Sequence, residues 1–141
     1  MRRRTTGQTL VIFALFVPLI LLPIVGYAVQ TTLVASRAAL LQAAAARAAE
    51  DGAQAIDVTV FRVTGVLRLD PAKAQLVTRA SFAEQDRPAQ VDRVEVSPTT
   101  VTVRAHDRVP LGFGGFLSAG SVRLAAAATA RLAAGYAGPG G

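Results

Sequence analysis

The feature that most constrains this chain is an apolar segment close to its N-terminus. Residues 10–29 carry no charged side chain. As an α-helix rising ~1.5 Å per residue, this segment spans the ~30 Å hydrocarbon layer of a bilayer. A surface helix of a soluble protein normally shows a polar stripe, and this segment has none. We therefore predict a transmembrane helix over residues 10–29.

The two flanks of the apolar segment differ in charge. Arg2, Arg3 and Arg4 precede it, whereas Gln30–Thr32 on the other side are uncharged. Basic residues stay on the cytoplasmic side of a membrane helix. Residues 1–9 are thus predicted to form a cytoplasmic leader, and the chain after the helix is predicted to be extracytoplasmic.

The helix is expected to continue beyond the membrane. No Pro or Gly occurs from Gln30 to Asp51, alanine and leucine dominate, and Gly52 is a suitable residue just past a helix end. Small residues let helices approach closely, so lateral packing on other helices is one use of this surface, and packing on the protein's own domain is the other. The candidate helix-packing residues are Phe13, Leu33, Leu40, Leu41, Ala44 and Ala48.

Residues 52–134 are predicted to form a small extracytoplasmic domain. Residues 53–69 favour a strand or an irregular connection. Asp70 and Pro71 then offer a helix N-cap and first residue, which predicts a short helix over 72–84. The residues expected on its buried face are Leu76, Val77, Ala80 and Ala83.

After this helix the pattern changes to a period of two. A turn at Ser97–Thr99 separates two alternating segments and predicts an antiparallel hairpin. An apolar, glycine-rich loop is expected over 109–117, a further strand over 121–132 and a loose tail over 135–141. The predicted fold class is α+β, with a long N-terminal helix, one short helix and an antiparallel sheet of three to four strands. The residues predicted to face inward in the hairpin are Val94, Val96, Val101 and Val103.

The N-terminal segment resembles the TadE/TadG-like family, the minor pseudopilins of tight-adherence (Flp-type) pilus systems. Gly7–Leu15 followed by Val17–Leu19 is similar to the opening of that family, and Arg47–Ala53 resembles the end of its long helix. Residues 101–103 followed by 109–111, and residues 128–130, resemble its closing strands. The likeness covers most of the chain.

This resemblance implies a non-catalytic pilus-assembly subunit, held in the bacterial inner or cytoplasmic membrane by one helix. It implies as partners the bilayer, other pilin or pseudopilin subunits and pilus-assembly proteins. It also implies a prepilin-peptidase cleavage site between Gly7 and Gln8. Cleaved members usually carry Glu where this chain has Ile12, so an intact leader and cleavage after Gly7 both stay open.

The residue inventory argues against an enzyme. His106 is the only histidine, and its neighbour Asp107 points to the opposite face of a strand. The chain has no cysteine, and Glu50–Asp51 lack further ligands nearby, so we expect neither a metal nor a cofactor. Without Arg2–Arg4, 12 basic residues face 9 acidic ones, and their scatter argues against nucleic-acid binding. No small-molecule substrate is expected either.

Two alternatives remain open. Residues 10–25 could be the core of a cleavable secretory signal with a small-residue site at Gly26–Ala28, although such cores are usually shorter, about 7–15 residues. The chain could instead be a generic anchored binding module. Phe113 and Phe116 would then form a partner loop, unless both rings close the core of the domain.

Overall fold

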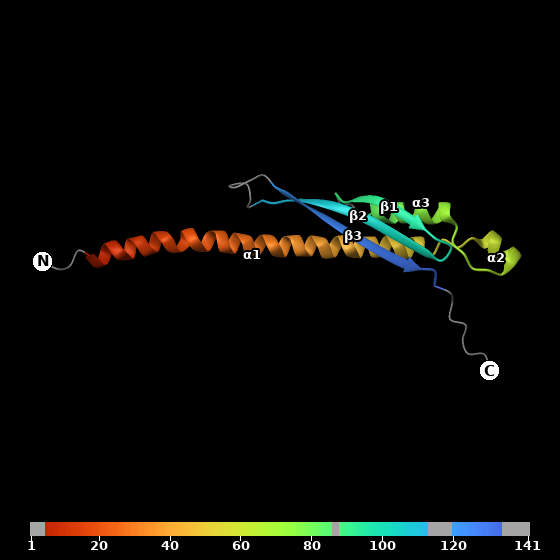
Figure 1. Ribbon diagram of the computed structural model, residues 1–141, viewed down its shortest axis with the longest axis horizontal. Helices are drawn as coiled ribbons and strands as arrows, with labels where there is room; N and C mark the ends of the chain where they lie inside the picture. The colour runs from red at the N-terminus through yellow and green to blue at the C-terminus, as the bar shows by residue number, and fades with distance from the viewer. Residues whose placement is uncertain (1–4, 86–87, 113–119, 134–141) are drawn as a thin grey trace, which may run out of the picture.

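The computed structural model describes residues 5–85, 88–112 and 120–133. Its elements follow the order α1, α2, α3, β1, β2, β3. Figure 1 shows α1 as a long rod whose C-terminal half carries all the other elements, while its N-terminal half extends away from them. The α+β class is therefore confirmed, with a three-stranded antiparallel sheet.

The long N-terminal helix is confirmed as one continuous element. α1 covers Thr5–Gly52, or 48 residues, which corresponds to a length of about 72 Å at helical rise. It begins before the apolar segment and includes both Pro18 and Pro23. The membrane-spanning candidate and the outer helix are thus one rod.

The prediction of a strand or irregular connection over residues 53–69 is wrong in its middle. Val58–Thr64 form helix α2. The Asp57 carboxylate accepts a hydrogen bond from the Val60 N–H (3.0 Å), and Gly65 ends the helix with φ of 69°. These two local signals, an N-cap and a left-handed C-cap, outweigh the alternating pattern between them.

Helix α3, Pro71–Ala83, begins where the sequence predicts. The Asp70 carboxylate accepts hydrogen bonds from the Ala72 and Lys73 N–H groups at 3.0 and 3.1 Å. Its predicted buried face is wrong, however, because Leu76 is 71% exposed. Small side chains on another face allow a closer approach to the alanine-rich α1. The buried residues of α3 are Ala74, Thr78 and Phe82.

Gly52 also has a different role from the one predicted. It is the last residue of α1, and Gly65 is the glycine with positive φ among the described residues. A Cβ atom at Gly52 would lie 2.0 Å from Thr78 Oγ1 and 3.3 Å from the Ala74 carbonyl oxygen. The glycine is therefore required by the close contact between α1 and α3.

The sheet has strand order β1-β2-β3, with β1 at Gln90–Val96, β2 at Thr100–Pro110 and β3 at Ser121–Arg131. The predicted hairpin is confirmed, since Val94 pairs with Val103 and Val96 with Val101. The strand predicted over 121–132 is confirmed as well. The loop predicted from residue 109 begins later, because Val109 and Pro110 still pair with β3.

The sheet packs one face on α1 and α3, forming two layers (Figure 1). The contribution of α1 to this core is mostly alanine, so the sheet lies close to the helix. The main buried apolar residues are Leu41, Ala44, Ala45, Ala48, Ala49, Leu69, Val101, Val103 and Ala105.

Candidate membrane and partner surfaces

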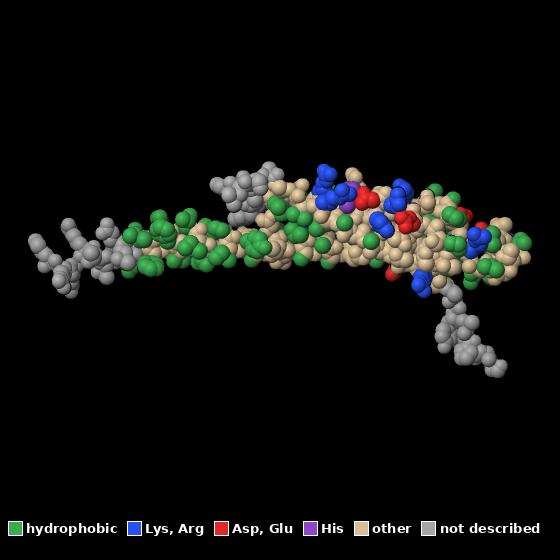
Figure 2. Space-filling model, in the orientation of Figure 1, with side chains coloured by type: hydrophobic (Ala, Val, Ile, Leu, Met, Phe, Trp, Pro, Cys, Tyr) green, Lys and Arg blue, Asp and Glu red, His purple; other side chains and the backbone are tan. Residues whose placement is uncertain are grey.

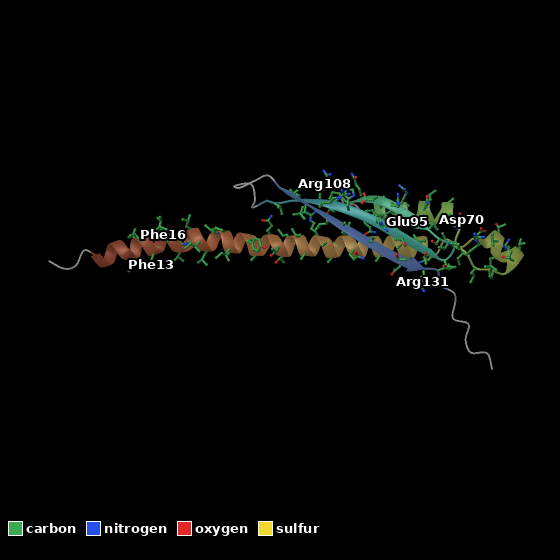
Figure 3. The ribbon with its side chains drawn as sticks, in the orientation of Figure 1. Phe13, Phe16, Asp70, Glu95, Arg108 and Arg131 are labelled. Atoms are coloured by element: carbon green, nitrogen blue, oxygen red, sulfur yellow. The ribbon has the colours of Figure 1, made fainter. Side chains whose placement is uncertain are left out.

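Most of the apolar segment of α1 is exposed, although Gly26 and Val29 near its end line a groove beside β2. Phe13, Leu19 and Tyr27 are 67%, 66% and 72% exposed. Figure 2 shows hydrophobic side chains around this half of the rod, and in Figure 3 Phe13 and Phe16 project outward from it. By length and composition, this is one helix able to cross a membrane. The same features also occur in signal sequences, so they are compatible with a single-pass anchor without defining its orientation.

The structure divides the six candidate helix-packing residues into two groups. Leu41, Ala44 and Ala48 are 2%, 3% and 0% exposed and belong to the protein's own core. Leu33 and Leu40 remain 58% and 49% exposed on the outer half of α1, and Phe13 lies in the apolar segment. The core of the domain thus uses three of these residues, and the other three are open to lipid or to another helix.

The candidate processing site lies within helix α1. Gly7 and Gln8 both have helical conformation, and a Cβ atom at Gly7 would contact no other atom within 4 Å. The leader arginines Arg2, Arg3 and Arg4 lie outside the described residues. Phe113 and Phe116 of the candidate partner loop also lie outside them.

His106 has a partner that the sequence does not reveal. Its Nδ1 lies 2.6 Å from Asp92 Oδ1, and Arg123 Nη2 lies 3.7 Å from the other oxygen of that carboxylate. Asp107 faces the opposite side of β2, is buried, and accepts a hydrogen bond from the Arg108 N–H. The contact depends on the strand register and on the bulge between Val91 and Arg93, which sequence periodicity cannot place.

The acidic pair at the end of α1 serves a structural contact. The Ser81 hydroxyl of α3 donates a hydrogen bond to Asp51 Oδ2, while Glu50 is exposed. Among the described residues, no group of three or more His, Cys, Asp or Glu side chains could hold a metal ion. Asp51 therefore helps to join α1 to α3.

Two further surfaces were not apparent from the sequence. Helix α2 buries none of its residues, and with the segment after it forms a distal apolar patch. At the other end of the sheet, a groove of about 140 Å³ separates α1 from the end of β2. The distal patch comprises Val58, Phe61, Val63 and Val66, which are 51%, 43%, 81% and 58% exposed.

The comparisons with known proteins supply no relative. No protein-family model, curated protein or solved structure matches this chain.

Proposed function

We propose that this protein is a membrane-anchored, non-catalytic assembly subunit of the minor-pseudopilin type, acting in a tight-adherence pilus or a related secretion apparatus. The single observation that carries the proposal is the exposed apolar half of α1, joined without a break to a folded domain. Exposed side chains such as Phe13 and Leu19 need an apolar surrounding. A bilayer or a bundle of similar helices provides one.

The orientation follows from the flanking charges. Arg2–Arg4 would stay in the cytoplasm, and the domain built on residues 52–134 would stand outside the bacterial inner membrane. The chain has no cysteine, so a single introduced cysteine is the only thiol that a labelling reagent can modify. Its reactivity therefore shows on which side of the membrane that position lies. Gln54→Cys, exposed beyond the end of α1, should react with an impermeant maleimide on spheroplasts, whereas Arg3→Cys should react only after lysis. The reverse labelling pattern would contradict this orientation.

The state of the N-terminus separates the remaining possibilities. N-terminal sequencing of the protein from carbonate-washed membranes should give Met1 or Gln8, and both results fit an anchored subunit. A start after Ala28, with the protein in the soluble fraction, would establish a secreted domain instead. α1 is continuous through Gly26–Ala28, so such a cut would sever the rod.

Lateral association is proposed to use the exposed side of the outer helix. Ala44 and Ala48 are unsuitable for testing it, because arginine at either position would disrupt the protein's own core. Leu40→Arg is the better perturbation, since the leucine is 49% exposed. Losing a buried leucine contact costs about 2 kcal/mol, so co-purification with pilus-assembly proteins should fall roughly 10- to 30-fold.

Ala35→Arg provides the matched control for Leu40→Arg. Ala35 is exposed on the same helix, and at ~100° per residue it points about 140° away from Leu40. The control variant should retain its partners, and both variants should remain in the membrane. Equal recovery of partners with both variants would show that this side of α1 is not the contact.

The distal patch on α2 favours a second candidate function, an anchored binding module. Phe61 and two valines of α2, with Val66 just after the helix, are exposed at the far end of the molecule. Exposed apolar side chains that lie close together are typical of a protein-binding surface. Under this alternative, Phe61→Ser would release the partner and Leu40→Arg would not. The two variants therefore distinguish association along the rod from association at its tip.

A further inference from the structure

The sheet runs alongside α1, so that one of its ends lies beside the end of the apolar segment. Val109 and Pro110, at the end of β2, line one side of a groove of about 140 Å³. Gly26 and Val29, the last part of the apolar segment, line the other side, and Gly26 is buried. One end of the sheet therefore lies beside residues that belong to the candidate membrane span.

A hydrogen bond between α1 and β3 shows which residues of the two elements lie at the same level along the axis of α1. The Gln42 side-chain amide donates to the Ala127 carbonyl (2.9 Å), which places these two residues side by side. Arg123 lies four residues further along β3 toward the groove, about 13 Å at ~3.3 Å per residue. The same distance on α1 is about nine residues, which brings Arg123 level with Leu33, only ~6 Å beyond Val29. Each headgroup layer is about 5–7 Å thick, so Arg123 lies at phosphate height.

Two arginines are exposed at this end of the sheet, and Asp92 and the buried Asp107 lie beside them. Arg108 is the direct cross-strand partner of Arg123, and both are exposed on the face turned away from α1. Asp92 contacts Arg123 and His106, and no ion pair of Arg108 is found in the described part of the chain. Like charges directly opposite each other destabilise a sheet. A bound anion would remove that cost, and guanidinium groups match phosphate geometry well.

We propose that this end of the sheet is seated in the headgroup layer of the membrane that α1 spans, with Arg108 and Arg123 binding the phosphates of anionic phospholipids. The proposal rests on the membrane anchoring proposed above. Pro110, which is exposed next to the buried Val109, would lie at the boundary between headgroups and acyl chains, beside the apolar surface of α1. The surface fits lipid because its basic and apolar parts are stacked in the same order as the layers of a bilayer.

The first test compares lipid retention by the full-length protein. Protein extracted in nonionic detergent is supplied with equal amounts of phosphatidylglycerol and phosphatidylcholine, and the retained lipids are counted by native mass spectrometry. Wild-type protein should prefer phosphatidylglycerol. Each arginine near an anionic surface contributes about fivefold, so Arg108→Gln/Arg123→Gln should reduce the preference by about 25-fold.

Figure 3 shows Arg108 and Arg131 at opposite ends of the sheet. Arg131→Gln is the matched control, because Arg131 lies on the same face of β3 as Arg123, at the other end of that strand. It should leave the lipid preference unchanged. An equal loss with Arg131→Gln, or no loss with the double variant, would overturn the proposal. Displacement of phosphatidylglycerol by inorganic phosphate at similar concentration would overturn it as well, since the site would then recognise a small anion.

The second test requires no arginine variant. A fluorophore on Ser121→Cys, at the end of β3 beside Pro110, should be quenched by lipids carrying a nitroxide headgroup, and one on Gln54→Cys should not. Equal quenching at the two positions would refute the seated geometry. If wild-type protein leaves the membrane in carbonate, the anchoring itself fails; if it stays without lipid preference or quenching, only this inference fails.

Discussion

The contact between Gly52 and Thr78 offers the sharpest test of how the domain is held on α1. In Gly52→Ala, the new Cβ atom would lie 2.0 Å from Thr78 Oγ1. Two atoms cannot share that space, so Thr78 must leave its rotamer or α3 must move away from α1. Because Thr78 is 0% exposed, the displaced side chain cannot turn into solvent.

The magnitude follows from overpacking. Forcing one extra methyl group into a tight core costs about 1–3 kcal/mol. Gly52→Ala/Thr78→Ala removes the 2.0 Å overlap and leaves approaches of 3.3 Å to the Ala74 carbonyl oxygen and 3.4 Å to the Cβ atom of residue 78, so the double variant should recover most of this loss. Thr78→Ala alone should be close to neutral. It loses about 1 kcal/mol of apolar burial, but it also removes a hydroxyl with no hydrogen-bond partner among the described residues.

The stabilities of the wild type, the two single variants and the double variant can be measured by pulse proteolysis of the full-length protein in nonionic detergent and urea. With m near 1–1.5 kcal/mol/M, a loss of about 2 kcal/mol lowers the urea midpoint by about 1.3–2 M. Gly112→Ala is the control, because its Cβ atom would meet nothing within 4 Å. An unchanged midpoint for Gly52→Ala would refute the close contact, and a double variant no more stable than Gly52→Ala would show that Thr78 is not the obstacle.

The remaining predictions concern the helix caps. Asp70→Ala removes the acceptor for two N–H groups of α3 and should lower the stability of the whole domain by about 1 kcal/mol in the same urea assay. Asp57→Ala removes the corresponding cap of α2, but α2 buries no residue, so faster hydrogen exchange confined to 58–64 is expected with an unchanged midpoint. Gly65→Ala should act likewise, since alanine at φ of 69° is strained by about 1 kcal/mol. A midpoint shift for Asp57→Ala as large as that for Asp70→Ala would mean that α2 belongs to the cooperative core.

The elements predicted correctly are those with strong local signals. A long charge-free segment, a run without Pro or Gly, and the Asp70–Pro71 start each determine structure within a few residues. The hairpin was predictable because inward valines at a period of two set its register across a short turn. Helix α2 was missed because the alternating pattern of residues 58–63 favours a strand, whereas the caps at Asp57 and Gly65 favour a helix.

The buried face of α3 and the surfaces around it depend on tertiary contacts. Hydrophobicity alone selects Leu76, yet a helix lying against alanines packs best through Ala74 and Thr78. The pairing of His106 with Asp92 requires a bulge, and the groove beside Gly26 requires knowing that β2 runs back along α1. Such features combine residues far apart in the chain, so periodicity within one segment could not reveal them.

The unbroken passage of α1 from its apolar half into the core also has a mechanical consequence. The part of α1 beyond Val29 is about 35 Å long, and membrane helices tilt by about 20° on average. When a straight helix of that length tilts by this angle, its far end moves sideways by about 12 Å. In the membrane arrangement proposed above, a change in bilayer thickness or in neighbouring helices would therefore move the far end of the domain sideways, because α1 is one continuous helix.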